Sequence, residues 1–350
     1  MKQRRYLGID IGSTTFKAVL LGADGTVERT TYKRTQPADA GKVACTGRCS
    51  GCGACGGGSA RRLVLEFMRA AGVKSFSDLS AIVVTGSQIV EDTRKFIPFD
   101  FQVSEVTAHV AGAKFLHPDV DAIIDCGGQD SKCMVYNPSM KLWSSMMSGV
   151  CAAGTGSFLD SIAAKLGVKV EDVADKVNYE SGAEFSSVCA VLSATSINKF
   201  KNRVPVGDLL AGACKAQART ILNSVGQLLL NAPGRKILFQ GGVAFNKAVA
   251  FFLKKMTGSE IVIPQYHEVM GALGAAVIAR DFDGLREKGS LDIAKVAYEP
   301  TRGKSTLLRI KSTKHDFFSV DKSRPLVWRN LFFPAEVLNA MSCQIGRAHV

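Results

Sequence analysis

The chain has 350 residues, of which 46% are apolar, and this size and composition indicate a globular protein of about two domains rather than one small core. Its 44 basic and 31 acidic residues give a formal net charge of +13, but they form no basic helix or aromatic-interleaved stripe, which disfavours nucleic-acid binding. No uncharged apolar run reaches the roughly 18 residues that a membrane-spanning helix needs.

The cysteine content points to a reducing compartment. Asp10 and Ser13 interrupt the apolar run that follows the basic N-terminus, so we expect no export segment and a cytoplasmic protein. The ten cysteines are then expected to serve metal or redox roles rather than disulfides.

Three strands are predicted first, over residues 6–11, 16–21 and 27–33. The turn Gly12-Ser13-Thr14 separates the first two. Small residues let backbone N–H groups approach a phosphate, hydroxyl groups donate to it, and Asp10 can hold a hydrated Mg²⁺. A phosphate-binding turn is therefore predicted here, with an ordinary hairpin as the alternative.

A cysteine-rich segment over residues 43–59 follows. Cys45, Cys49, Cys52 and Cys55 lie among glycines and small polar residues with the spacing C-x3-C-x2-C-x2-C of a chelating loop. Four thiolates suit an iron–sulfur cluster or zinc. We predict a metal site with iron–sulfur ahead of zinc, and the alternative is a thiol-rich loop that binds no metal.

The pattern of the first turn recurs after a helix predicted over 61–71, a strand over 81–86 and a helix over 104–115. Strands over 121–125 and 131–136 flank the turn Gly127-Gly128-Gln129, and Asp125 precedes that turn as Asp10 precedes the first. The repeat predicts a duplicated fold in which two phosphate-binding turns face each other.

Two further cysteines each precede a predicted helix. Cys151 stands before the turn Gly154-Thr155-Gly156 and a helix over 157–166, and Cys189 stands before a helix over 190–201. A helix N-terminus favours an anion such as a phosphate, a thiolate or an iron–sulfur cluster. The alternative for both cysteines is a small buried thiol. The remaining elements are helices over 171–177, 206–231, 245–256 and 270–280 and strands over 236–240 and 261–263.

Five motifs in chain order resemble those of the superfamily of sugar kinases, actin and heat-shock chaperones. They are residues 9–14, 125–130, 151–158, 241–246 and 271–276. The motif at 151–158, together with Cys189, is similar to that of the activators of 2-hydroxyacyl-CoA dehydratases and benzoyl-CoA reductases. The resemblance covers residues 6–280.

The resemblance implies an α/β fold of two ribonuclease-H-like domains, a duplicated actin-like ATPase fold with ATP in the cleft between them. We predict a first domain over 1–116 that carries the cysteine-rich insert, a second over 117–280, and a basic tail over 281–350. Residues 330–341 look like the start of a fused dehydratase component.

The resemblance also implies residue roles. Asp10 and Asp125 would organise Mg²⁺ and the attacking water, and Gln129 would lie near the γ-phosphate. Cys151 and Cys189 of two subunits would share one [4Fe–4S] cluster. The residues implied to bind ATP or ADP are Gly12, Ser13, Thr14, Lys17, Gly127, Gly128, Gly154, Thr155, Gly156, Gly241, Gly242 and Asn246.

The function implied is that of an ATP-hydrolysing homodimer that passes an electron from a ferredoxin or flavodoxin to a dehydratase or reductase. A small-molecule kinase of the same superfamily without a redox role is the alternative. A non-enzymatic metal-sensing or scaffold protein is a third hypothesis, resting only on the cysteine-rich segment. We predict structural roles for His109 and His267 and packing roles for Cys126, Cys133 and Cys214.

Overall fold

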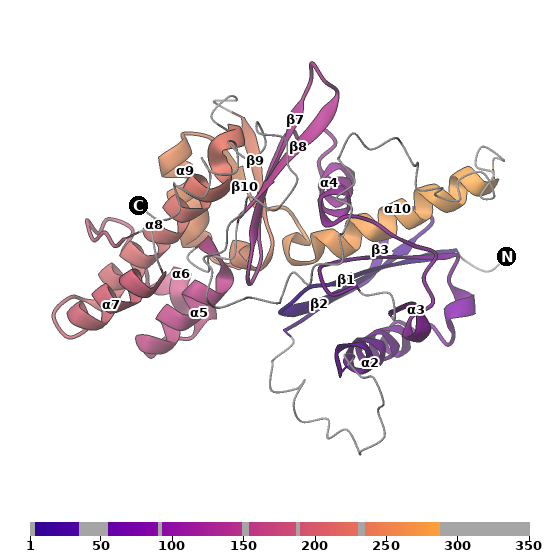
Figure 1. The fold of residues 1–350 in the computed structure, drawn as a ribbon, viewed down its shortest axis with the longest axis horizontal. Helices are drawn as coiled ribbons and strands as arrows, with labels where there is room; N and C mark the ends of the chain where they lie inside the picture. Colours follow the sequence, from indigo (N-terminus) through magenta and orange to yellow (C-terminus); the bar gives the residue numbers. More distant parts are fainter. Residues whose placement is uncertain are drawn as a thin grey trace, which may run out of the picture. The chain divides into compact units, whose positions relative to one another are not determined.

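The structure is a computed structural model that describes residues 4–34, 55–89, 93–148, 154–186, 190–229 and 235–287 (Figure 1). Within these residues the strands form two five-stranded sheets. Every helix and strand predicted from the sequence is present in this part of the chain, with ends that differ by a few residues.

The first sheet has the strand order β3-β2-β1-β4-β5. Its strands are β1 (Arg5–Ile11), β2 (Thr15–Gly22), β3 (Val27–Arg34), β4 (Ala81–Thr85) and β5 (Phe101–Gln102). The first three form an antiparallel meander, and β4 and β5 add in parallel to β1. Strands β2 and β3 form an antiparallel hairpin, and in its turn Asp24 Oδ1 accepts a hydrogen bond from Thr26 N at 2.9 Å.

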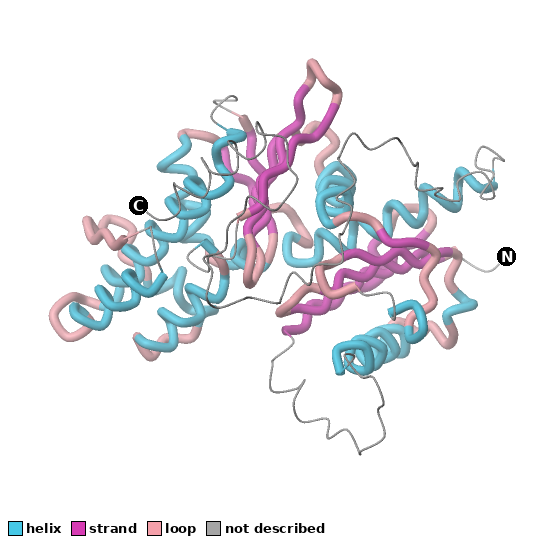
Figure 2. Tube along the Cα trace, viewed as in Figure 1, coloured by secondary structure: helices cyan, strands magenta, loops and turns pink. Residues whose placement is uncertain are grey.

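Helices cover both faces of the first sheet, as Figure 2 shows. Strand side chains alternate between faces. Accordingly, Leu7 and Ile9 of β1 pack with α2 (Cys55–Ala70), and Tyr6 packs with α10 (Met270–Glu287) on the other face. The buried residues of α2 recur at helical spacing, and they are Ala60, Val64, Phe67 and Met68. Both faces of β1 are buried, so this strand is fixed in the centre of the sheet.

The second sheet repeats the topology of the first, with the order β10-β9-β6-β7-β8. Its strands are β6 (Ala122–Cys126), β7 (Ser131–Asn137), β8 (Leu142–Met147), β9 (Lys236–Gln240) and β10 (Glu260–Val262). Again the first three are antiparallel neighbours and the last two add in parallel. The predicted duplication is therefore confirmed strand by strand.

The remaining helices belong mostly to the second half of the chain. They are α3 (Thr93–Phe96), α4 (Glu105–Leu116), α5 (Gly156–Lys165), α6 (Val173–Lys176), α7 (Ala190–Phe200), α8 (Val206–Val225) and α9 (Lys247–Thr257). Residues of α5, α8 and α9 share one core with β6, while Ala113 of α4 packs with Ile123 and Met134 on the opposite face.

Helix α10 packs on the first sheet although it ends the described chain (Figure 1). Its residues therefore contribute to the core of the first half. The predicted domain boundaries at 116 and 280 remain predictions. The tail from residue 288 onward and residues 43–54 of the insert lie outside the described residues. None of the helices described is both long and apolar enough to cross a bilayer.

Candidate functional site

Two turns of the same construction follow the first strand of each sheet. Asp10 at the end of β1 lies directly opposite Lys17 of β2. Asp125 at the end of β6 lies directly opposite Lys132 of β7. Each turn therefore places one carboxylate and one ammonium group at the same edge of its sheet.

The backbone closes both turns in the same way. Gly12 N donates to Thr15 O, and Gly127 N donates to Asp130 O, each at 2.9 Å. Gly128 has no space for a side chain, because a Cβ there would overlap with Thr14 Oγ1. Glycine is therefore what allows the second turn to approach the first.

The two turns line one cavity of about 390 Å³, a volume within the range of small-molecule sites. Nine residues predicted from the sequence line it: Asp10, Gly12, Ser13, Thr14, Lys17, Asp125, Gly127, Gly128 and Gln129. Eight others complete the lining: Thr15, Ser87, Gln88, Glu105, His109, Asp130, Lys132 and Ser148. The sequence-predicted phosphate turns thus face a common space.

The first turn contributes a buried ion pair. Lys17 Nζ lies 2.8 Å from Asp10 Oδ2, and the Asp10 side chain is 5% exposed. Burial alone would lower the pKa of Lys17, but the Asp10 carboxylate outweighs it, so the pKa of Lys17 is raised. Lys17 is therefore a permanent cation in the cavity.

The second turn contributes a buried carboxylate with an open hydrogen-bonding site. Asp125 Oδ1 has no hydrogen-bond partner among the described residues, and its nearest ion contact is His109 Nδ1 at 3.4 Å. His109 also lies 2.9 Å from Gln240 Nε2. Burial raises the pKa of Asp125, but the neighbouring His109, Lys132 and Lys17 bring it below its ordinary value.

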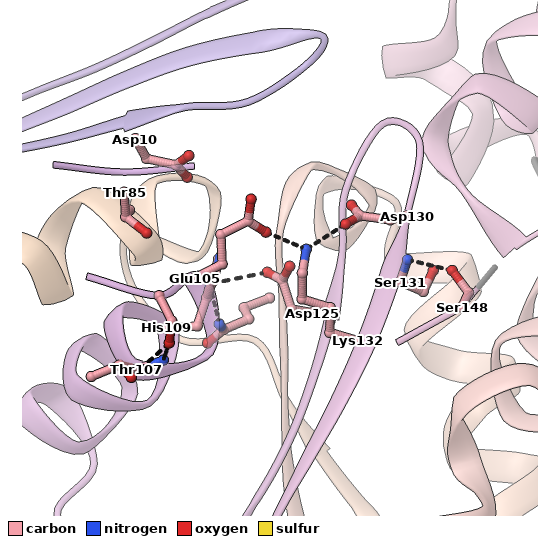
Figure 3. A network of polar contacts seen from close by, with 12 residues as sticks. Asp10, Thr85, Glu105, Thr107, His109, Asp125, Asp130, Ser131, Lys132 and Ser148 are labelled. Atoms are coloured by element: carbon pink, nitrogen blue, oxygen red, sulfur yellow. Dashed lines mark hydrogen bonds and ion pairs between the residues drawn. The ribbon is translucent and has the colours of Figure 1, made fainter. Parts of the chain in front are cut away.

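Helix α4 reaches the second turn with two side chains one helical turn apart, Glu105 and His109 (Figure 3). Lys132 Nζ lies 2.8 Å from Glu105 Oε2 and 2.5 Å from Asp130 Oδ2. These carboxylates and Asp125 raise the pKa of Lys132, although burial acts in the opposite direction. The cavity therefore holds two ammonium groups among four carboxylates.

Helix α10 approaches Asp10 and His109 closely at Gly271. A Cβ at Gly271 would lie 2.8 Å from Asp10 Oδ2 and 3.1 Å from His109 Nε2. The absence of a side chain leaves room for both groups. His109, predicted to be a structural histidine, thus lies at the cavity between the two aspartate-bearing strands. His267 lies elsewhere, with Nδ1 3.2 Å from Gly241 O.

The predicted cofactor residues Gly154, Thr155 and Gly156 lie at the start of α5 and are not part of the cavity lining. Gly156 N donates to Gly127 O at 2.9 Å, and Ser157 N donates to Gly128 O at 3.0 Å. The carbonyl of Thr155 accepts a hydrogen bond from Gln217 Nε2 at 3.0 Å. The N-terminal N–H groups of α5 that were expected to meet an anion are therefore occupied by carbonyl groups of the turn.

Ser131, the first residue of β7, is hydrogen-bonded to Ser148 and Gly154, which flank residues 149–153. Its backbone N–H donates to Ser148 Oγ at 2.9 Å, and its hydroxyl donates to Gly154 O at 2.8 Å. Cys126 Sγ also donates to Gly154 O at 3.0 Å. The second turn is thus hydrogen-bonded to the residues that precede and follow positions 149–153.

Three further residues that the resemblance implies to bind ATP or ADP are Gly241, Gly242 and Asn246, and Gly241 lies beside the second turn. Gly241 has φ +89°, and a Cβ there would overlap with the backbone of Cys126, so glycine is required. Gly242 approaches the Tyr32 hydroxyl. Asn246 caps α9, with Oδ1 accepting from Ala248 N at 3.0 Å, and it is 6% exposed. The side chain of Asn246 is therefore engaged in capping here.

The cysteines separate into two groups. Cys126, Cys133 and Cys214 are free and buried, and burial raises the pKa of each thiol to about 12, which confirms their packing role. Six cysteines lie outside the described residues, and they are Cys45, Cys49, Cys52, Cys151, Cys189 and Cys343. Cys55 begins α2. Among the described residues, no group of three or more His, Cys, Asp or Glu could hold a metal ion.

The cavity fits a nucleotide phosphate with Mg²⁺. Glycine-rich turns expose backbone N–H groups, Lys17 supplies a cation, and Asp125 Oδ1 is buried without a hydrogen-bond partner among the described residues. Mg²⁺ binds through one or two carboxylates plus phosphate oxygens and water, so Asp10 and Asp125 suffice as its protein ligands.

Sequence reasoning did not predict four charged or titratable side chains of the lining, which are Glu105, His109, Asp130 and Lys132. Lys132 had a signal, because both turns read D-x-G-x4-K, from Asp10 to Lys17 and from Asp125 to Lys132. Glu105 and His109 had no local signal, because only tertiary packing brings α4 to the second turn.

Comparison with known proteins decides the family. The sequence profile of the BadF/BadG/BcrA/BcrD ATPase family matches residues 7–279. The chain belongs to this family.

Named relatives of this ATPase include dehydratase activators. The 2-hydroxyisocaproyl-CoA dehydratase activator of Clostridioides difficile is 29% identical over 279 residues, covering 79% of this chain and 94% of the activator. The (R)-2-hydroxyglutaryl-CoA dehydratase activating ATPase of Acidaminococcus fermentans is 36% identical over 185 residues, covering 51% of this chain and 68% of that ATPase. The resemblance inferred from the motifs is thereby confirmed.

Solved structures confirm the fold. The C. difficile activator with bound ADPNP superposes with a TM-score of 0.67 at 26% identity, covering 81% of this chain and 97% of that one. Component A of the A. fermentans dehydratase gives 0.66 at 27% identity, covering 80% and 99%. A glucokinase from Streptomyces griseus, with a TM-score of 0.50 at 13% identity, shares the fold alone. The two-domain α/β ATPase architecture predicted from the sequence is correct.

Proposed function

We propose that this ATPase binds and hydrolyses ATP in the cavity between its two D-x-G turns and thereby activates a 2-hydroxyacyl-CoA dehydratase, a benzoyl-CoA reductase or a related cluster enzyme by delivering a low-potential electron. The observation that carries the proposal is the paired-turn cavity, in a chain that aligns with 94% of a named dehydratase activator.

The cavity residues have different roles in the proposed binding and hydrolysis of ATP. Lys17 and the N–H groups of the two turns bind phosphate oxygens. Asp10 and Asp125 hold Mg²⁺ and orient the attacking water, and Gln129 contacts the γ-phosphate. The depressed pKa of Asp125 supports this role, because the carboxylate then stays ionised at neutral pH. Gly241 and Gly242 leave space at the nucleoside side.

The redox part rests on the sequence motifs and on the names of the relatives. Cys151 and Cys189 of two copies supply four thiolates, the number that a [4Fe–4S] cluster requires, and the cluster provides the one-electron chemistry. Ferredoxin or flavodoxin is the proposed donor, in a reducing cytoplasm. The insert cysteines from Cys45 to Cys55 would form a second iron–sulfur or zinc site.

Hydrogen bonds around Ser131 support coupling between the two parts. Ser148 and Gly154 flank the segment that contains Cys151, and both are hydrogen-bonded to Ser131 of the second turn. A shift of this turn on nucleotide binding would therefore act on both ends of that segment.

Anaerobic purification tests the proposal. We expect a brown dimer with about four irons per dimer, and more if the insert binds iron. Cys151→Ser and Cys189→Ser should each lose this cluster, while Cys133→Ala, at a buried thiol with no ligand role, should retain it. A colourless protein that transfers phosphate from ATP to a small molecule would replace the proposal with the kinase alternative.

ATP dependence provides the second arm of the experiment. The reduced wild-type dimer should reduce its acceptor enzyme only with hydrolysable ATP, and Asp125→Asn should retain iron but lose this transfer. Acceptor reduction at the same rate without nucleotide would contradict the coupling.

A further inference from the structure

The second turn carries a lysine that repeats the position of Lys17. Both turns have the sequence D-x-G-x4-K, and in both the lysine pairs in register with the aspartate across an antiparallel strand pair. The two sheets also share one topology. Lys132 is therefore the structural counterpart of Lys17 in the duplicated half.

The two lysines have different contacts. Lys17 Nζ binds the aspartate opposite it, Asp10. Lys132 Nζ instead lies between Glu105 Oε2 at 2.8 Å and Asp130 Oδ2 at 2.5 Å (Figure 3). Asp125 keeps an oxygen without a hydrogen-bond partner among the described residues. Lys132 thus crosses the second turn toward α4.

Burial of the Lys132 ammonium group costs desolvation free energy. The Lys132 side chain is 5% exposed, whereas Glu105 is 24% and Asp130 is 39% exposed. A buried ion pair contributes little net stability, since desolvation offsets the attraction between the charges. All three side chains line the cavity. The ammonium is therefore held at the cavity wall by two carboxylates that water can reach.

We propose that Lys132 is a phosphate-binding residue, the second-turn counterpart of Lys17, and that Glu105 and Asp130 position its ammonium toward the terminal phosphates of the nucleotide. This rests on the proposed function in that the cavity holds ATP. A charge-assisted hydrogen bond from a buried ammonium is among the strongest contacts that a phosphate oxygen can receive.

Binding of two nucleotides tests the proposal. Affinities for ADPNP with Mg²⁺ and for AMP are measured by calorimetry on the full chain, as wild type and as Lys132→Gln, Lys132→Arg and Lys236→Gln. Lys236 is an exposed lysine at the start of β9 and serves as the matched control. AMP lacks the terminal phosphates, so its binding reports whether the rest of the site is intact.

We expect Lys132→Gln to weaken ADPNP binding by about 10- to 100-fold while AMP binding stays unchanged. Lys132→Arg should recover part of the loss, and Lys236→Gln should match the wild type. Equal ADPNP affinity of Lys132→Gln and the wild type overturns the proposal, and so does an equal loss for both nucleotides. A wild type that binds neither nucleotide refutes the proposed function instead.

A second variant, in which the charges of Glu105 and Lys132 are removed together, controls for misfolding of Lys132→Gln. If Lys132→Gln does not fold, the double variant Glu105→Gln with Lys132→Gln also removes the charge of Glu105, and the only described carboxylate that then lacks its Lys132 ion pair is Asp130, which is 39% exposed. The same selective loss of ADPNP affinity is expected, and wild-type affinity in this variant would overturn the proposal.

Discussion

At the residue scale, the site depends on two buried carboxylates, one from each turn. Asp10 and Asp125 are 3% and 4% exposed. Lys17 Nζ lies 2.8 Å from Asp10 Oδ2, and His109 Nδ1 lies 3.4 Å from Asp125 Oδ1. An uncompensated buried charge is costly, and Lys17 beside Asp10 offsets that cost at the first turn.

The pH dependence of the free energy of unfolding should reveal the contribution of the ionised Asp125 carboxylate. Its pKa is lower when folded than the unfolded value of about 3.9, so it stabilises the fold above that pH, and this contribution is lost as the pH falls through the folded value. We expect Asp125→Asn to unfold in less urea than the wild type near neutral pH, with the gap shrinking below about pH 4. Exposed Asp119→Asn is the control, and a gap independent of pH would contradict the assignment.

Thiol reactivity should distinguish the three buried cysteines from thiols with ordinary pKa values. At a pKa of about 12, Cys126, Cys133 and Cys214 are thiolate in only roughly one molecule in ten thousand at about pH 8. We expect mass spectrometry after alkylation of the native protein to find these three unmodified, and modified once the chain is unfolded in urea. Rapid native labelling of Cys126 would show that it is not buried.

At the residue scale, the sequence predicted site residues that lie together in one continuous stretch. The aspartates and glycines of both turns were predicted because each turn is a continuous stretch. Asn246 and the Gly154–Gly156 turn were predicted as cofactor residues, but capping and turn support engage them in the structure. Such competing hydrogen bonds depend on neighbours distant in sequence.

At the element scale, α10 fixes the first turn. Gly8 of β1 faces this helix, and a Cβ there would overlap with the carbonyl of Ala272 and the N–H of Ala276. Gly274 of α10 meets the backbone of α4 in the same way. The three elements therefore pack with backbones nearly in contact, so the position of Asp10 relative to His109 is rigid. The sequence predicted each element, but not that the last helix would pack against the first strand.

A single methyl group should test this packing. We expect Gly8→Ala to lower the free energy of unfolding by about 1–3 kcal/mol, because the helix must move away from the strand. Gly182→Ala is the matched control, since a Cβ there has no neighbour within 4 Å and its φ is not positive. Chemical denaturation measures both, and equal stabilities would show that α10 is not packed so closely.

At the scale of the whole described chain, duplication builds the site. Two sheets of one topology each end their first strand in a D-x-G-x4-K turn, and the turns line one cavity. Each half supplies part of the charged lining, with Asp10 and Lys17 from the first and Asp125 and Lys132 from the second. A ligand bound in this cavity therefore contacts residues of both halves.

The position of the phosphates tests this account most directly. Crystals of the full chain grown with Mg²⁺ and ADPNP should show the β- and γ-phosphates between residues 12–14 and 127–129, with Lys17 and Lys132 on their oxygens and Mg²⁺ on the side of Asp10 and Asp125. Phosphate density outside this cavity, with both turns unoccupied, would contradict it.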